Sequence, residues 1–140
     1  MTESNDPSSE ALISRPIRLI EPHELAEMIK TSPNNVVVVD LRDEDYVEGC
    51  IPHSEHYPSD GFEEAVYTLI DSIKAKNPQP SWIVFHCQQS MSRGPKGARL
   101  FQKEAKDILP NIRVVVLRGG WNAWADRYWG EEGMIQPILS

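Results

Sequence analysis

The sequence predicts an α/β domain built on a mainly parallel sheet. Three short runs, at residues 36–39, 82–85 and 113–117, are rich in apolar residues that do not alternate with polar ones. Such runs are typical of strands buried on both faces. Between them lie segments with apolar residues at three- and four-residue spacing, which is typical of helices. Alternating strands and helices favour right-handed crossovers, which place helices on both faces of one five-stranded sheet.

The individual elements follow from the same patterns, in chain order. The short apolar stretch at 17–20 predicts a first strand, and Leu25, Met28 and Ile29 share one face of a helix at 22–30. The strand at 36–39 is followed by a short strand at 54–57 and a helix at 61–76 with six apolar residues at helical spacing. After the strand at 82–85 come a helix at 95–106, the strand at 113–117 and a short helix around Trp121 and Trp124.

Length and composition limit the organisation and the partners. The chain has 140 residues, 40% hydrophobic and 25% charged, which suits one globular domain. We expect a flexible N-terminal tail at 1–16, the domain at 17–131 and a C-terminal tail at 132–140. The polar N-terminus resembles no signal peptide and no apolar run reaches the ~20 residues of a membrane helix, so we expect a cytoplasmic or nuclear protein without a membrane partner. The net charge of −7 argues against nucleic acid. The oligomeric state is left open.

The chemistry of the chain centres on Cys87. This residue follows a predicted strand, and Pro95, a residue suited to the first turn of a helix, lies eight positions later. A loop that enters a helix N-terminus presents backbone N–H groups and the positive end of the helix dipole to an anion. Arg93 adds a two-pronged donor for phosphate-like oxygens. The same positive field favours a thiolate, so the loop predicts a cysteine nucleophile facing a tetrahedral oxyanion.

Two other interpretations of Cys87 are simpler. A lone cysteine at a strand end is usually inert packing, but the combination with Arg93 and a helix start argues against that here. A metal site at His86 and Cys87 would need further ligands, and the sequence has no CxxC or HxxxH spacing that would supply them. We therefore predict no metal and no cofactor.

The segment His86–Pro95 resembles the H-C-x-x-S-x-x-R-G-P signature of rhodanese-fold phosphatases and the related eukaryotic arsenate reductases. Residues 40–46 resemble the D-x-R stretch of rhodanese-like domains, with an acidic-aromatic pair at its end. Residues 49–52 resemble the G-H-I-P turn with Cys50 in place of histidine, and residues 117–120 resemble the closing Gly-Gly corner. Five residues separate Cys87 from Arg93, which is similar to the oxyanion-binding branch; sulfurtransferases of this fold carry a loop one residue shorter.

The resemblance implies roles for particular residues. Cys87 and Arg93 would be catalytic. The oxyanion would be bound by the loop residues Gln88, Gln89, Ser90, Met91, Ser92 and Arg93, and His86, Asp40 and Arg42 would support the loop.

Departures from the family pattern remove two features. The cell-cycle phosphatases carry acidic residues at Gln88 and Ser92, so no local general acid remains here, and Leu41 stands where they often have a cysteine that protects the nucleophile. We expect Cys50 to lie toward the amino edge of the sheet, away from Cys87, and to serve packing.

Several functions follow from the resemblance. The first is a cysteine-dependent phosphatase that hydrolyses phosphomonoesters, with phosphotyrosine or phosphothreonine protein as a candidate substrate, through a phosphocysteine. The alternative is an arsenate reductase that needs glutathione or glutaredoxin as reductant. A sulfurtransferase and a non-catalytic rhodanese-like module are further alternatives. The expected partner is a phosphorylated substrate or a small oxyanion.

Overall fold

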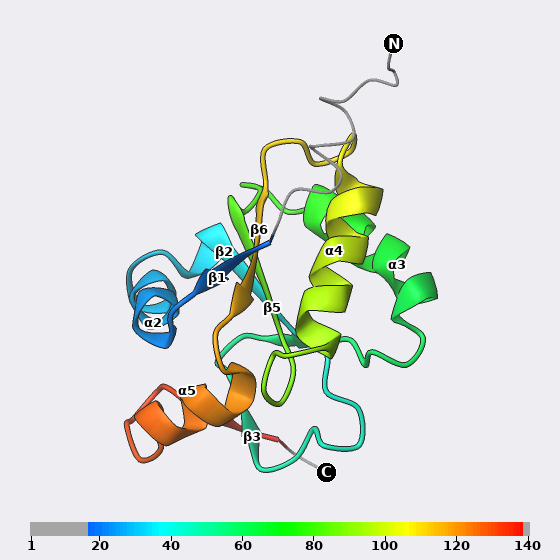
Figure 1. Ribbon diagram of the computed structural model, residues 1–140. Helices are drawn as coiled ribbons and strands as arrows, with labels where there is room; N and C mark the ends of the chain where they lie inside the picture. The colour runs from blue at the N-terminus through cyan, green and yellow to red at the C-terminus, as the bar shows by residue number, and fades with distance from the viewer. Residues whose placement is uncertain (1–16, 139–140) are drawn as a thin grey trace.

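A computed structural model describes residues 17–138, and it confirms the predicted five-stranded sheet (Figure 1). The strands are β1 (Arg18–Ile20), β2 (Val36–Asp40), β4 (Glu55–His56), β5 (Trp82–His86) and β6 (Arg113–Leu117). All neighbours are parallel, in the order β1-β6-β5-β2-β4, so β5 lies at the centre. A separate antiparallel pair joins β3 (Gly49–Cys50) to β7 (Gln136–Pro137). The expected N-terminal tail at 1–16 lies outside the described residues.

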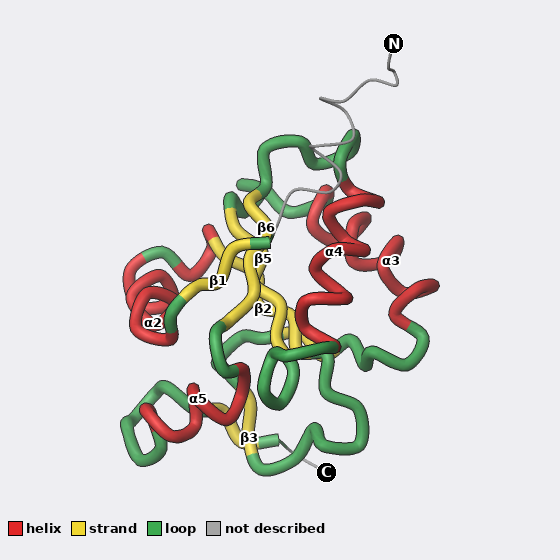
Figure 2. The backbone as a smooth tube through the Cα atoms, in the orientation of Figure 1, coloured by secondary structure: helices red, strands yellow, loops and turns green. Residues whose placement is uncertain are grey.

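The helices cover both faces of the sheet, as the apolar patterns predict (Figures 1 and 2). They are α2 (Pro22–Thr31), α3 (Phe62–Lys74), α4 (Arg93–Ala105) and α5 (Gly120–Tyr128), with a 3₁₀ turn η1 (Pro33–Asn35) before β2. Alternate residues of the strands point to opposite faces: Val37 and Val39 pack with α3 and α4, whereas Val36 and Val38 pack with α2 and α5. This two-sided burial explains why the strand sequences lack alternation.

The C-terminal boundary predicted at residue 131 is too early. Met134 is only 3% exposed, and its carbonyl oxygen accepts a hydrogen bond from Trp124 Nε1 at 2.7 Å. Strand β7 then pairs with β3. Residues 132–140 have little apolar periodicity, so the sequence alone gives no sign that part of this segment packs on the domain.

Two other boundaries differ in ways that matter for the site. Helix α4 begins at Arg93 rather than at Pro95, so Arg93 is its first residue. Pro95 is then the third helical position, where a backbone N–H still has no intrahelical partner. The strand predicted at 54–57 shortens to β4, which pairs only with the last two residues of β2.

Among residues 17–138, no helix combines the length and apolar character needed to cross a membrane.

Candidate active site

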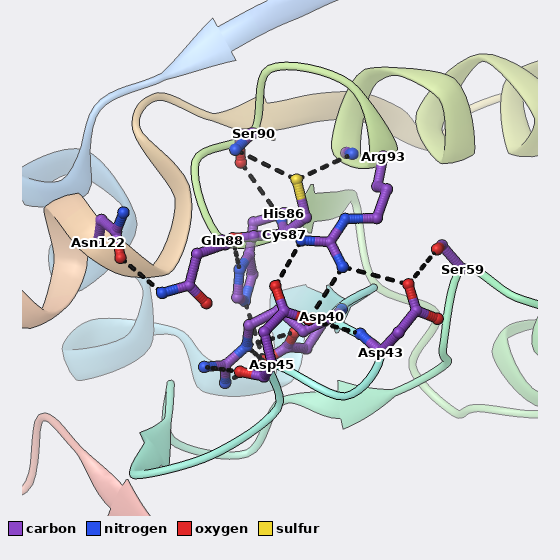
Figure 3. A network of polar contacts seen from close by, with 12 residues as sticks. Asp40, Asp43, Asp45, Ser59, His86, Cys87, Gln88, Ser90, Arg93 and Asn122 are labelled. Carbon is purple, nitrogen blue, oxygen red and sulfur yellow. Dashed lines mark hydrogen bonds and ion pairs between the residues drawn. The ribbon is translucent and has the colours of Figure 1, made fainter.

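The loop between β5 and α4 folds around the sulfur of Cys87. Cys87 directly follows the central strand and is 3% exposed. Its Sγ accepts hydrogen bonds from the backbone N–H of Ser90 at 3.2 Å and of Gly94 at 3.3 Å (Figure 3). Ser90 adopts a positive φ of 56°, which turns the chain back over the sulfur, and its Oγ accepts from the Cys87 N–H at 3.4 Å. These donors and the N-terminus of α4 direct the positive ends of their dipoles toward the sulfur.

The N-terminus of α5 holds the loop from the other side. The Trp121 N–H donates to the Cys87 carbonyl and the Asn122 N–H donates to the Gln88 carbonyl, both at 2.9 Å. The side chains of Gln88 and Asn122 are also joined, at 2.7 Å. Gly120 permits this contact because its φ is 59° and a β-carbon there would lie 2.4 Å from the Cys87 oxygen. The predicted Gly-Gly corner is therefore a brace for the loop.

Arg93 binds two aspartates from the turn after β2. Its Nη1 donates to Asp45 Oδ1 at 2.9 Å and to Asp43 Oδ2 at 3.1 Å, and its Nη2 donates to Asp45 Oδ2 (Figure 3). These hydrogen bonds lower the pKa of Asp45 to about 2. The bond to Asp45 also raises the pKa of Arg93. Partial burial alone would raise the pKa of Asp43, but hydrogen bonds from the Asp60 N–H, Ser59 and Arg93 outweigh it and lower the pKa.

A buried polar cluster lies beneath the loop. Asp40, Arg42 and His86 have no exposed surface. Arg42 donates to Asp40 through Nε at 3.0 Å and Nη2 at 2.7 Å, and Nη2 also donates to the Gly49 carbonyl. His86 Nδ1 lies 3.1 Å from the Cys87 carbonyl, which can only accept, so this nitrogen carries the proton. Burial lowers the pKa of His86, so the ring is neutral at neutral pH.

The structure therefore brings together some of the predicted site residues and turns others away. Cys87, Ser90 and Arg93 converge, whereas Gln88 reaches toward Asn122 and Met91 is 80% exposed. Gln89 and Ser92 are also exposed. Asp40 and Arg42 bind each other, and His86 contacts the loop directly. The oxyanion-binding role of residues 88–93 stays a prediction.

The groups that hold Arg93 and the loop were not predicted from the sequence. These are Asp43, Asp45, Ser59, Gly94, Gly120 and Asn122. The acidic-aromatic pair pointed at Asp45 only as part of a family pattern. One usable signal was topological: loops after neighbouring parallel strands meet at the same sheet edge, so an acidic turn after β2 is available to an arginine after β5.

The predicted position of Cys50 is wrong. Cys50 is buried at 4% exposure and is a free thiol, but Figure 1 shows β3 near α5, at the carboxyl end of the strands. Arg42, which binds the last residue of β2, also donates to the carbonyl of Gly49 at 2.8 Å. Together with burial, the neighbouring Cys50 raises the pKa of Tyr46 to about 12. The prediction failed because the chain does not cross directly to the amino edge after β2.

A cleft of about 400 Å³ opens beside Arg93, between α3 and α4. Its lining includes Arg93 and Lys96, the acidic residues Glu63 and Glu104, and apolar residues of both helices. Space for a substrate is therefore present next to the guanidinium. Within residues 17–138, no three side chains of His, Cys, Asp or Glu are grouped so that they could hold a metal ion.

Known proteins resemble the chain in sequence and in fold. Residues 21–127 match the model of the rhodanese-like domain. The dual specificity phosphatase ibp1 of Schizosaccharomyces pombe is 32% identical over 134 residues, covering 84% of this chain and 94% of that protein. Arsenate reductase 2.2 of Oryza sativa subsp. japonica is 31% identical over 116 residues, covering 80% and 85%.

A solved structure supports the same assignment. Ygr203w, described as a yeast protein tyrosine phosphatase of the rhodanese family, superposes with a TM-score of 0.78 at 27% identity, covering 89% of this chain and 94% of that one. The family model spans most of the chain, and two relatives exceed 30% identity over more than two thirds of it. With the parallel sheet and the cysteine loop at its carboxyl edge, the chain belongs to the family of rhodanese-like domains, whose relatives here include Cdc25-like phosphatases and arsenate reductases.

Proposed function

We propose that the protein is a cysteine-dependent phosphatase that hydrolyses phosphomonoesters. The observation that carries the proposal is the pair of backbone N–H groups, from Ser90 and Gly94, that donate to the Cys87 sulfur at the N-terminus of α4. A sulfur that accepts such bonds is favoured as the thiolate, which is the nucleophilic form. Arg93, partly exposed beside it, supplies positive charge for the phosphoryl oxygens.

The reaction would proceed in two displacements at phosphorus. The Cys87 thiolate attacks in line, an S–P bond forms and the bond to the ester oxygen breaks. Water then attacks the phosphocysteine, which releases inorganic phosphate and restores the thiolate. Arg93 and the loop amides are the donors for the oxygens that carry charge in both transition states.

Among the described residues, the two carboxylates that contact Arg93 do not offer the leaving oxygen a proton. Asp43 and Asp45 are the carboxylates nearest the guanidinium, and their lowered pKa values keep them ionised at neutral pH. A general acid is typically worth about 10²–10⁴ in rate, so esters of acidic alcohols should react fastest. We therefore expect aryl phosphates, including phosphotyrosine, to be turned over faster than alkyl phosphates, including phosphothreonine.

Arsenate reduction is a second candidate, supported by the likeness to arsenate reductase 2.2 of rice. Arsenate is a tetrahedral oxyanion like phosphate. Cys87 would displace one oxygen, released as water, to form an S–As(V) adduct. Attack by glutathione on the Cys87 sulfur would release arsenite and leave a mixed disulfide, and a second thiol, from glutathione or glutaredoxin, would return Cys87 to the thiol. Two electrons pass from two thiols to arsenic.

The two candidates are separated by a paired assay. The purified protein is given an aryl phosphate without thiol, and arsenate with glutathione and glutaredoxin. Cys87→Ser should abolish whichever activity is found, and hydrolysis that survives unchanged in this variant contradicts both mechanisms. A non-catalytic module instead predicts that neither activity appears and that Cys87 reacts with iodoacetamide at mildly acid pH no faster than a model thiol.

A further inference from the structure

The guanidinium of Arg93 is held on one side only. It has five N–H donors in a fixed plane. Nη1 directs its two hydrogens to Asp43 and Asp45, and Nη2 directs one to Asp45. The remaining donors are Nε–H and the second Nη2–H, which project in parallel from the opposite edge, and within the described residues no hydrogen bond engages Nε. Figure 3 shows the guanidinium between the Cys87 sulfur and the two aspartates.

The two aspartates are themselves held in place. Asp43 accepts hydrogen bonds from the Ser59 hydroxyl and from the Asp60 N–H, at 2.9 Å for the latter. Asp45 accepts from the Asp43 N–H at 2.8 Å through Oδ1, one of its two oxygens that bind Arg93. The turn after β2 is therefore a preformed receptor for the arginine rather than a pair of mobile surface acids.

We propose that Asp43 and Asp45 are positioning residues that fix Arg93 with its Nε and Nη2 edge toward the Cys87 loop, ready for an oxyanion. This inference rests on the proposed function. A free arginine loses side-chain entropy when it binds a ligand, and a clamped one has lost most of it already. Two carboxylates beside an anion site repel the ligand, so the geometric benefit must exceed that repulsion.

The direction in which a single substitution changes oxyanion affinity tests the proposal. Asp45→Asn removes a negative charge next to the anion site. Long-range electrostatics alone predicts tighter oxyanion binding, and so does a clamp that competes with the ligand for Arg93. The positioning role predicts weaker binding, by about tenfold, the factor typical of losing one charge-assisted hydrogen bond. Asp43→Asn should act in the same direction but less strongly, because Asp43 makes only one of the three bonds.

A matched control lies between the two aspartates. Glu44 is exposed and no hydrogen bond or ion pair engages it among the described residues. Glu44→Gln removes the same charge from the same turn, so we expect unchanged or slightly tighter binding. The probe is tungstate, which binds as a tetrahedral anion; its affinity is measured from protection of Cys87 against iodoacetamide, followed by mass spectrometry of the peptide that carries Cys87.

Activity and a double-substitution cycle complete the test. The kcat/KM for an aryl phosphate should fall with Asp45→Asn and stay unchanged with Glu44→Gln. In an Arg93→Ala background, Asp45→Asn should lose its effect on tungstate affinity, an outcome that a purely structural role would not give. Equal or tighter tungstate binding by Asp45→Asn contradicts the positioning role of the two aspartates, but it does not contradict the proposed function. Absence of tungstate protection in the unsubstituted protein contradicts the proposed function itself.

Discussion

Gly120→Ala is expected to damage the cysteine loop from outside it. A β-carbon at this position would lie 2.4 Å from the Cys87 oxygen, 2.8 Å from the Gln88 oxygen and 2.9 Å from the Ser90 nitrogen. All three are backbone atoms, so no side chain can rotate away to make room. Either the loop or the first turn of α5 must move.

The expected cost can be worked out from these contacts. A positive φ costs alanine about 1–2 kcal/mol relative to glycine. Displacement of α5 also weakens the two hydrogen bonds from Trp121 and Asn122 to the loop, each worth about 1 kcal/mol. We therefore expect Gly120→Ala to lower the free energy of unfolding by about 3 kcal/mol in total, measured by urea denaturation. Because the loop amides shift, tungstate affinity should fall as well.

Gly130→Ala is the matched control. Gly130 also has a positive φ, 86°, but a β-carbon there would meet nothing within 4 Å. It should show only the conformational cost of about 1–2 kcal/mol and bind tungstate normally. Close packing of Gly120 on the loop is contradicted if Gly120→Ala is no less stable than Gly130→Ala, or if both variants bind tungstate equally well.

Further expectations concern stability. Arg42→Met should cost about 3–5 kcal/mol in urea denaturation, because it removes the only charged side chain that donates to the buried carboxylate of Asp40 within the described residues; a loss within about 1 kcal/mol would contradict this account of the buried pair. The pKa of Asp45 is lowered to about 2 in the folded protein, so the folded state binds its proton less readily than the unfolded state. The stabilisation that ionised Asp45 gives the folded state is therefore present above the unfolded pKa, and it is lost as the pH falls from about 4 toward 2. Over that range, the difference in unfolding free energy between the unsubstituted protein and Asp45→Asn should become smaller. Deletion of residues 132–140 removes buried Met134 and the acceptor for Trp124 Nε1, so the melting temperature should fall; an unchanged value would show that this segment contributes nothing.

Much of the fold could be predicted because burial constrains residue types locally. A strand covered on both faces must be apolar at every position, and residues 36–39 and 82–85 satisfy this. The position of Cys87 at the end of a strand, with a helix shortly after it, followed from the same reasoning, but the helix begins at Arg93 rather than at Pro95. The C-terminal boundary was wrong because pairing between β3 and β7 depends on residues far apart in the chain, and the location of Cys50 was wrong because the chain does not cross directly to the amino edge after β2.

What the amino-acid order alone decided was the class of fold, the loop that carries the thiol and the spacing from that thiol to Arg93. What only the tertiary structure decided was the set of groups around them. Asp43 and Asp45 meet Arg93 because β2 lies beside β5, and Gly120 meets the loop because α5 follows the other neighbour, β6. The physical reason is that hydrophobic periodicity reports which face of an element is buried, whereas the order of strands in the sheet is set by the packing of the whole chain.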